Sequence, residues 1–512
     1  MRNDHLKLWA VVAFMTAVTV VKSFIFLNSW HVWLNQTEQT SVKYPIDDDH
    51  IEASDEDSAN ETREVSGTGG SAFCLLIKDD NDILSEWIAY HYHTMMMRRL
   101  IVAVDPSSKT SPSDILNGYT REGSNGNFDL EVTVWAEDSF MPDYFRSDPQ
   151  DYLKMPYTTL WQANVKKLPL KAKLRTLTAD DINRADFTDE QRAVAHKINN
   201  HQIRQRYFYY KCMDLVKKEY GRNKIAHTVL IDTDEFLVPN PWVSSHVYEN
   251  APVDETYANS AEIISMFPRK PSAGSLLSYY DRFLDQSHRI INSAGIDQTP
   301  SSQGCVMAPR MLFGSKEDKD ATVTTTGKSS TTTITWNHTK FESLRWRYHQ
   351  DFNNGFKTFF ENKPGSYPMK AIIDVHKHKL SPKEGFGVNV IPMTLPGPHY
   401  PSWRCPMPPE NNFIENSLKY DQPLAIYHYL GSVERFLYRG DSRRDPLIYE
   451  AKNNISNYAP GDTNRPIDGI TYREDDRWWI KGWFDSFLET HGAEAVYSVL
   501  GKDFATKQQH QA

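Results

Sequence analysis

The first apolar run of the chain spans residues 8–28 and is broken by Lys22 and a few small polar residues. Its length matches one crossing of a lipid bilayer. Arg2 and Lys7 precede the run, and positive charge before a first span favours a cytoplasmic amino terminus. We therefore predict a cytoplasmic tail at 1–7 and a single-pass type II signal anchor at 8–28. A cleaved signal peptide is the alternative, but no clear small-x-small cleavage site follows the run.

Polar and acidic residues fill positions 35–70, which are rich in Ser, Thr and Asn and nearly free of aromatics after Tyr44. Such a segment cannot bury enough apolar surface to fold alone. We predict a flexible lumenal stem at 29–71, which would hold the globular part of the chain away from the membrane.

Alternating strand and helix patterns begin at residue 72. Phe73–Ile77 is an unbroken apolar run of the kind found in strands buried on both faces. Ile83, Trp87 and Tyr90 then recur at helical spacing, and Arg99–Val104 is a second apolar strand. A strand, a helix and a strand within about thirty residues form a βαβ unit. This unit predicts a parallel sheet with a right-handed crossover.

Similar patterns continue along the chain. The Thr- and Ser-rich residues 322–335 fit either a mobile loop or a polar edge strand. The predicted fold class is α/β, with a single mixed, mainly parallel sheet flanked by helices and an N-terminal transmembrane helix. Strands are expected at 130–135, 229–231, 261–267, 304–308 and 371–375, a long helix at 191–220, and an insertion without clear periodicity at 137–188.

Composition narrows the classes of function. The formal net charge is −9 over 512 residues, which argues against a nucleic-acid partner because such proteins carry a basic face. Four cysteines are too few and too widely spaced for a disulfide scaffold or a zinc module. One or two disulfides are possible, but Cys74 and Cys212 lie in apolar contexts where a buried thiol is at least as expected. Four Asn-x-Ser/Thr sequons, at Asn35, Asn60, Asn337 and Asn454, agree with a lumenal location.

Three acids follow the apolar residues 229–231 within four positions: Asp232, Asp234 and Glu235. Acids at the carboxyl end of a buried strand lie where open α/β sheets bind ligands. If the chain stays extended, Asp232 and Asp234 share one face and can approach one divalent ion, whereas Glu235 faces the opposite way and would form a structural salt bridge. Oxygen ligands suit Mg²⁺ or Mn²⁺. A solvated acidic turn is the alternative interpretation.

Several segments resemble the GT-A glycosyltransferases, and in particular glycosyltransferase family 92 and its family-2-like relatives. The segment from Ile231 to Leu237 is similar to the metal-binding Asp-x-Asp motif of that fold. Lys78-Asp79-Asp80 stands where the family has Lys-Asn-Glu, and Glu86-Trp87-Ile-Ala-Tyr-His91 resembles its Glu-Trp-x-x-x-His helix. Further similar segments, in the family's order, are 310–315, 370–378, and 428–436 with Arg439-Gly440.

The resemblance implies a catalytic domain at 72–440, which includes the 137–188 insertion, and a C-terminal extension at 441–512. It implies an enzyme of the Golgi or ER membrane that transfers a hexose, with galactose favoured, from a UDP-sugar to a glycan acceptor on a glycoprotein or glycolipid. The cofactor would be Mn²⁺ or Mg²⁺. Within the motif, Asp234 would be the direct metal ligand, and Asp232 would lie near the ribose or a metal-bound water.

Other site residues are less sharply indicated. His376 and His378 share a face if the segment is extended, and imidazole suits Mn²⁺ better than Mg²⁺. We expect His378 to complete the metal site because it ends the similar segment 370–378; a surface or core hydrogen-bonding histidine is the alternative. Asp79 and Asp105 follow the first two strands and would contact uracil or ribose, or else cap the next segment. Lys78 would contact phosphate or remain an ordinary exposed lysine.

An inverting transfer requires a carboxylate that deprotonates the acceptor hydroxyl. Glu342, Asp374 and Glu434 are the candidates, and the sequence singles out none of them. Acceptor-side contacts are expected from His428, Arg435, Arg439 and the pair Trp478-Trp479, although such tryptophans are more often core residues.

Two other classes of function remain open. A haloacid dehalogenase-like phosphatase also ends a strand in Asp-x-Asp and uses the first acid, here Asp232, as nucleophile. The second is a catalytically inactive lumenal glycan-binding protein of the same fold.

Overall fold

The computed structural model describes residues 69–141, 189–221, 225–240, 265–294, 304–313, 324–328, 332–350, 369–377, 423–429, 470–473, 479–501 and 503–509, with Gly431, Arg435 and Tyr438. Residues 65–512 form one compact unit, distinct from residues 1–64. The predicted anchor at 8–28 lies outside the described residues, and within them no helix is long and apolar enough to cross a membrane.

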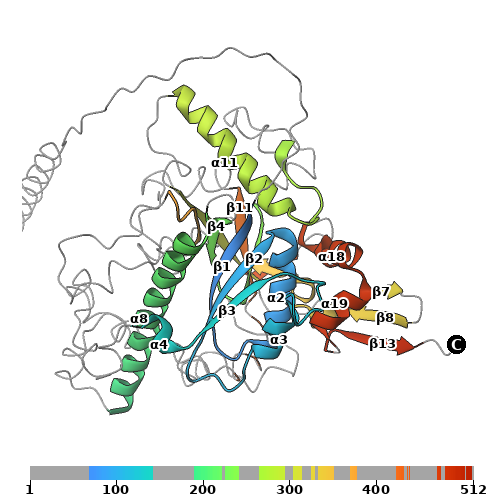
Figure 1. The fold of residues 1–512 in the computed structure, drawn as a ribbon, viewed down its shortest axis with the longest axis horizontal. Helices are drawn as coiled ribbons and strands as arrows, with labels where there is room; N and C mark the ends of the chain where they lie inside the picture. The colour runs from blue at the N-terminus through green and yellow to red at the C-terminus, as the bar shows by residue number, and fades with distance from the viewer. Residues whose placement is uncertain are drawn as a thin grey trace, which may run out of the picture. The chain divides into compact units, whose positions relative to one another are not determined.

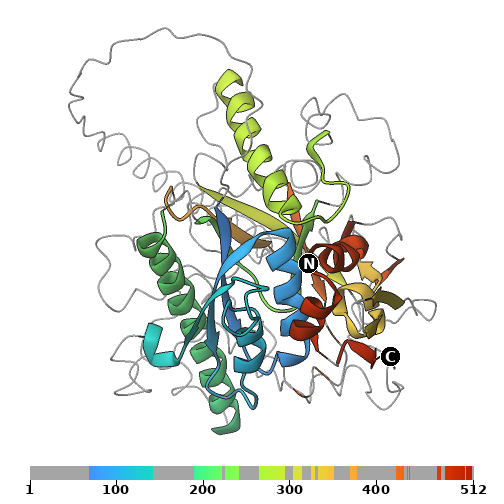
Figure 2. The ribbon, with the colours of Figure 1, turned by 45° about the vertical axis from the view of Figure 1, so that its right-hand side comes forward.

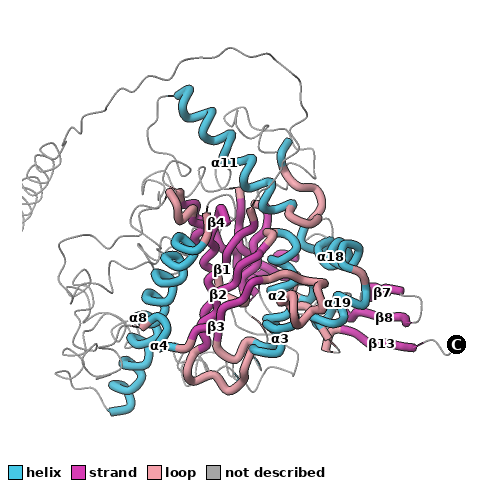
Figure 3. Tube along the Cα trace, viewed as in Figure 1, coloured by secondary structure: helices cyan, strands magenta, loops and turns pink. Residues whose placement is uncertain are grey.

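A large sheet forms the centre of the unit (Figure 3). Its main path runs β12-β9-β6-β10-β4-β1-β2-β3, and β11 pairs with both β6 and β5 beside this path. The strands are β1 (Gly70–Ile77), β2 (Met97–Val104), β3 (Glu131–Trp135), β4 (Ile225–Leu230), β5 (Glu235–Pro239), β6 (Cys305–Phe313), β9 (Tyr348–Gln350), β10 (Met369–Ile373), β11 (Leu424–Tyr429) and β12 (Ile470–Arg473).

The sheet is mixed, as the sequence predicts. The pairs β1–β2, β1–β4, β2–β3 and β6–β11 are parallel, and in the described part these ladders hold more paired residues than the antiparallel ones. The predicted βαβ unit is confirmed as β1, α2 (Asn81–Thr94) and β2. Because β4, β1, β2 and β3 run in the same direction, the residues that follow them gather at one edge of the sheet.

Helices cover both faces of the parallel strands. The long helix α8 (Asp189–Glu219) contacts β1 and β4, whereas α2 contacts β2 and β5, and Figures 1 and 2 show the two helices on opposite sides of these strands. Side chains of β1 alternate between the two cores: Phe73 and Leu75 pack on the α2 side, and Cys74 packs on the α8 side. This two-sided burial explains why the strands are continuous apolar runs in the sequence.

The described C-terminal residues pack onto the α2 side of the unit. The helices α18 (Trp483–His491) and α19 (Ala493–Leu500) contact α2, and the Ser85 hydroxyl donates to the Val499 carbonyl over 2.6 Å. The final strand β13 (Ala505–Gln509) joins a second, three-stranded sheet with β8 (Thr332–Asn337) and β7 (Thr324–Lys328). Of the two expectations for residues 322–335, the polar edge strand is therefore correct for β7.

The remaining helices complete the described part. They are α3 (Ser113–Gly118), α4 (Glu137–Phe140), α11 (Ser275–Ala294), α12 (Glu342–Arg345), and the 3₁₀ helices η3 (His338–Lys340) and η7 (Trp479–Gly482). The strand expected at 261–267 is not found at its described end, where residues 265 and 266 are helical.

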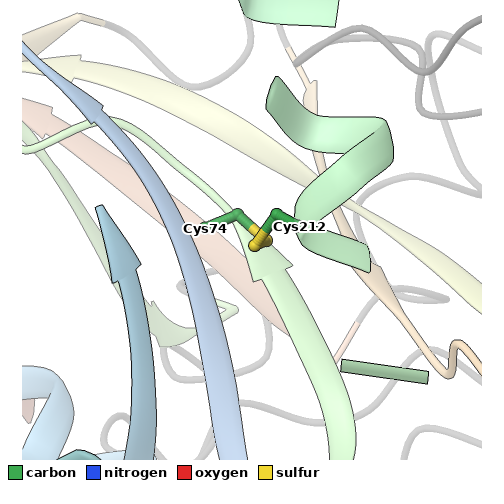
Figure 4. The surroundings of a disulfide bond; sticks show 2 residues. All are labelled: Cys74 and Cys212. Atoms are coloured by element: carbon green, nitrogen blue, oxygen red, sulfur yellow. A yellow bond between two sulfur atoms is a disulfide. The ribbon is translucent and has the colours of Figure 1, made fainter. Parts of the chain in front are cut away.

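A disulfide joins the two layers on the α8 side. Cys74 of β1 bonds Cys212 of α8 with their Cα atoms 6.1 Å apart (Figure 4). Of the two alternatives that the sequence leaves open for these cysteines, the disulfide is therefore correct, because the helix packs directly over the strand and brings two distant cysteines together. Cys305 is also disulfide-bonded.

Candidate active site

The three acids lie in a turn between two strands. β4 ends at Leu230 and β5 begins at Glu235, so Asp232 and Asp234 are not part of a strand. The Glu235 backbone N–H donates to the Asp232 carbonyl over 3.1 Å. The Asp232 N–H donates back to the Glu235 carboxylate over 2.9 Å. The prediction that the two aspartates share one face of an extended strand is therefore wrong, since these bonds close a turn and aim each acid separately.

A buried lysine and a partly buried arginine neutralise part of the acidic turn. The Lys370 ammonium of β10 lies 2.7 Å from the Asp232 carboxylate and 3.0 Å from that of Glu235. Arg310 of β6 lies 3.0 Å from the other Glu235 oxygen. Burial lowers the pKa of Lys370, but the charges of Asp232 and Glu235 outweigh burial and raise it above its ordinary value. Glu235 thus forms the structural salt bridges that the sequence predicts, and Asp232 shares one of its cations.

Asp234 instead faces a histidine. Its carboxylate lies 3.3 Å from Nε2 of His428 on β11, and its backbone carbonyl accepts the N–H of Tyr429 over 2.8 Å. The β11 register places His428 directly opposite Glu235. Ligand atoms of Asp234, Glu235 and His428 all lie within 4.8 Å of one another, the one such group among the described residues.

The donor set of this group fits a divalent transition metal. Burial lowers the pKa of His428, and the nearby Asp234 carboxylate opposes this only in part, so the imidazole is neutral and able to donate a lone pair. Its Nδ1 is buried without a hydrogen-bond partner among the described residues. Both oxygens of Glu235 already accept hydrogen bonds, so Asp234 and His428 are the better ligands. One carboxylate oxygen and one imidazole nitrogen could together hold a divalent cation.

The histidine that lies beside Asp234 is not one of those predicted as a metal ligand. His378 lies outside the described residues, and His376, just after β10, does not belong to the group of potential ligands. His428, which the sequence suggests only as an acceptor-side contact, is the histidine beside Asp234. Its position in the segment 428–436 was visible in the sequence, but its pairing with β5 was not.

Asp79 organises the loop that follows β2. Its Oδ1 accepts the Ser108 hydroxyl at 3.1 Å, the Lys109 N–H at 2.5 Å and the Thr110 N–H at 3.2 Å. Its Oδ2 is buried with no hydrogen-bond partner in the described part of the chain. Asp79 also has a φ of 53°, in the left-handed region that few non-glycine residues adopt. A buried acceptor left open at this edge could bind a ligand N–H or O–H.

Asp105 makes mainly local contacts. One of its oxygens accepts both the N–H and the hydroxyl of Ser107, and the other lies 3.5 Å from Arg204 of α8. Burial raises the pKa of Asp105, but these hydrogen bonds and the Arg204 charge outweigh it and lower the pKa. Turn formation, the alternative to ligand contact, describes this residue. Lys78 immediately precedes Asp79 and is half-buried, and its backbone N–H donates to the Asp80 carboxylate over 3.1 Å.

Side chains of α2 bind the backbone of β5, the strand that follows the acidic turn. The Trp87 indole donates to the Glu235 carbonyl over 2.9 Å. His91 accepts the Leu237 N–H over 3.3 Å, and the Tyr90 hydroxyl donates to the Leu237 carbonyl. Among the described strands, β5 pairs only with β11, so these side chains satisfy backbone groups that a second strand would otherwise bind. The Glu-Trp-x-x-x-His segment is therefore a support for the start of β5.

Glu86, the first residue of that segment, anchors α12. Its carboxylate accepts the backbone N–H groups of Glu342 and Ser343 over 2.7 and 2.9 Å. Complete burial raises its pKa to about 8, against the opposing hydrogen bonds from Ser343. Nothing in the sequence indicates this role of Glu86 except its place in the segment 86–91.

A second charged cluster surrounds Arg435. Its guanidinium lies 3.3 Å from Asp80 and 3.2 Å from Asp82. Burial lowers its pKa, but the charges of Asp82, Glu342 and Asp80 outweigh this, and Asp234 adds to the effect. Arg435 therefore connects the environment of Glu342 electrostatically with that of Asp234.

The three candidate bases differ in their surroundings. Glu342 is buried, its Oε2 accepts the Trp346 indole N–H over 2.5 Å, and burial raises its pKa although Arg435 opposes the shift. Asp374 accepts the backbone N–H groups of residues 376 and 377 and thus closes a turn after β10. Glu434 lies outside the described residues.

Of the pair Trp478-Trp479, the structure describes Trp479, for which the alternative of a core residue is correct. Trp479 is 5% exposed and packs edge-on against Tyr90 in the core. Its neighbour Trp478 and Arg439 lie outside the described residues. Trp479 is a core residue because η7 packs against β5 and α12.

Comparison of the chain with models of known protein families and with curated proteins finds no match.

Proposed function

We propose that this chain is a metal-dependent glycosyltransferase that transfers a hexose, with galactose favoured, from a UDP-sugar to a glycan acceptor. The observation that carries the proposal is the meeting of Asp234 and His428 after a buried strand of the sheet. The neighbouring acids Asp232 and Glu235 are neutralised by Lys370 and Arg310. Asp234 is thus the acid best placed to bind an added cation.

Mn²⁺ is the proposed cofactor, held by Asp234 and His428. When bound, the metal would supply Lewis-acid stabilisation of the charge on the departing diphosphate. Lys370 and the turn bonds hold Asp232 beside the metal-binding acid and keep it aimed toward β10. This arrangement supports Asp234 as the direct ligand and a second-layer role for Asp232.

The nucleotide would bind beside Asp79. The open Oδ2 of this residue can accept a hydrogen bond from the uracil N–H or from a ribose hydroxyl. The position after β1 supports this role, since ligands of open α/β sheets bind beyond the carboxyl ends of the strands. Lys78, in the same loop, would contact phosphate.

Glu342 is the proposed base of an inverting transfer. Burial raises the pKa of Glu342, which brings a carboxylate closer to the range that general-base work requires. The Arg435 cluster links it to the environment of Asp234. Asp374, by contrast, is engaged in its own turn.

A lumenal location in the Golgi or ER is part of the proposal, with membrane attachment through residues 8–28. The disulfide between Cys74 and Cys212 supports it, because such bonds persist mainly in oxidising compartments.

The central test compares Asp234→Asn with Asp232→Asn and with Asp503→Asn, a control at an exposed acid of the C-terminal turn. We expect Asp234→Asn to lower UDP-galactose turnover with Mn²⁺ by on the order of a hundredfold or more. Manganese-dependent UDP binding, measured by calorimetry, should be lost in parallel, while the unfolding temperature changes little. Asp503→Asn should behave as the natural chain.

The outcomes separate the alternatives. Full turnover by Asp234→Asn would refute the metal assignment. Glycan binding without any response to Mn²⁺ or to sugar nucleotides would favour the inactive glycan-binding protein. A panel of sugar nucleotides in the same hydrolysis assay would identify the donor.

A further inference from the structure

Asn337 ends β8 and precedes the 3₁₀ helix η3, within the sequon Asn337-His338-Thr339. Its side chain is exposed. The other three sequons of the chain lie outside the described residues. Asn337 is thus the one sequon asparagine whose surroundings the structure describes.

The hydrogen bonds of the sequon leave the reactive nitrogen free. The Asn337 Oδ1 accepts the Thr339 backbone N–H over 3.0 Å and the Thr339 hydroxyl over 2.7 Å. Its Nδ2 makes no hydrogen bond among the described residues. A substituent on Nδ2 would thus break none of these bonds, because the carbonyl oxygen holds the turn.

The backbone at this point is firmly fixed. The Asn337 N–H donates to the Phe504 carbonyl over 3.0 Å, and Trp336, the preceding residue, is fully buried and opposite Ala505 of β13. The exposed side chain therefore leaves the surface from a rigid strand end. A bulky solvated group can be carried there without loss of packing.

The disulfides of the chain agree with folding in the secretory pathway, where N-linked glycans are attached. Cys74, Cys212 and Cys305 are all disulfide-bonded, which is typical of proteins that fold in the secretory pathway. Asn-x-Thr sequons receive N-linked glycans in that pathway when they lie on the surface.

We propose that Asn337 carries an N-linked glycan. The new bond joins Nδ2 to C1 of the first sugar, and the bond from C1 to the oxygen of a lipid diphosphate carrier breaks. The diphosphate leaves with the bonding electrons, and Nδ2 loses one proton. The co-reactant is a lipid diphosphate oligosaccharide used by the transferase of the secretory pathway.

The modified position belongs to the small sheet. Asn337 pairs with Thr324 of β7, and β7, β8 and β13 form a sheet separate from the one that carries Asp234 (Figure 3).

The test expresses the full chain in a eukaryotic secretory pathway. Glycans are released enzymatically in ¹⁸O water, which marks each formerly modified asparagine, and peptides are mapped by mass spectrometry. We expect the label at residue 337. The molecular mass of Asn337→Gln and of Thr339→Ala should each be lower by the mass of one glycan, and Thr339→Ser should retain the glycan.

Asn127→Gln is the matched control, because Asn127 is exposed but outside any sequon. It should leave the glycan pattern unchanged. The unfolding temperature of each variant shows whether it is folded. If Thr339→Ala does not fold, Thr339→Ser still tests the proposal. An unlabelled residue 337 in the natural chain overturns the proposal, whatever the other sequons and the transferase assay show.

Discussion

Replacement of Lys370 by Met tests the charge arrangement around the acidic turn. The Lys370 ammonium lies 2.7 Å from Asp232 and 3.0 Å from Glu235. The side chains of Lys370 and Glu235 are both 0% exposed. Methionine keeps an unbranched apolar stem of similar length but removes the charge. The variant therefore leaves a buried carboxylate without one of its two cations.

The expected loss of unfolding free energy follows from burial. Removing one partner of a buried ion pair costs about 3–5 kcal/mol. Arg310 still neutralises Glu235 in the variant, and the Asp232 side chain is 32% exposed, so water screens part of its charge. We therefore expect the lower end of the range, about 3 kcal/mol.

The assay is urea denaturation of Lys370→Met, Glu235→Gln and the double variant. Because the two side chains are in contact, their effects should not add, and the double variant should recover at least about 1 kcal/mol of the summed losses. Lys507→Met is the control, since Lys507 forms an exposed ion pair with Glu494 and should lose about 1 kcal/mol or less. A Lys370→Met loss equal to that of the control, or additive effects in the cycle, would refute the reasoning.

Three further predictions concern the supports of the site. Trp87→Phe removes the indole donor of the buried Glu235 carbonyl and should cost about 1–3 kcal/mol in urea denaturation; unchanged stability would contradict this. Burial lowers the pKa of His91 to about 3. The stability that its neutral imidazole contributes is therefore complete above pH 6.5. It is lost as the pH falls toward 3, because only the unfolded chain then binds the proton, and the free energy of unfolding decreases by up to about 1.4 kcal/mol per pH unit. Unfolding titrations from pH 7 to 4 should therefore be shallower for His91→Asn, and equal slopes would count against a buried neutral imidazole. Joint replacement of Cys74 and Cys212 by Ala removes a cross-link over 138 residues and should lower the unfolding free energy by about 2–5 kcal/mol; a double variant as stable as the natural chain would show that the bond does not stabilise the fold.

Local patterns predict the elements of the core. β1, α2 and β2 appear where the apolar runs and helical spacing indicate them, because burial on both faces of a parallel strand leaves a continuous signal in the sequence. The long helix α8 is predicted for the same reason, by one apolar face at helical spacing.

Short-range geometry around the acids is predicted less well. The extended chain assumed for Asp232 and Asp234 is a turn, closed by the backbone and carboxylate of Glu235. A carboxylate that accepts a nearby N–H competes with strand pairing, and the sequence carries no sign of which interaction prevails.

The sequence by itself determines that three acids follow a buried strand, and that an oppositely charged group must accompany them. Only the tertiary structure decides which group neutralises which acid. Lys370 reaches Asp232 from 138 positions away, and Arg310 reaches Glu235 from 75; the sheet register, set by β10, β6 and β11, then leaves Asp234 to His428. Periodicity reports only which residues share a face of one element, whereas a charge pair depends on how distant elements align, and no local pattern contains that alignment.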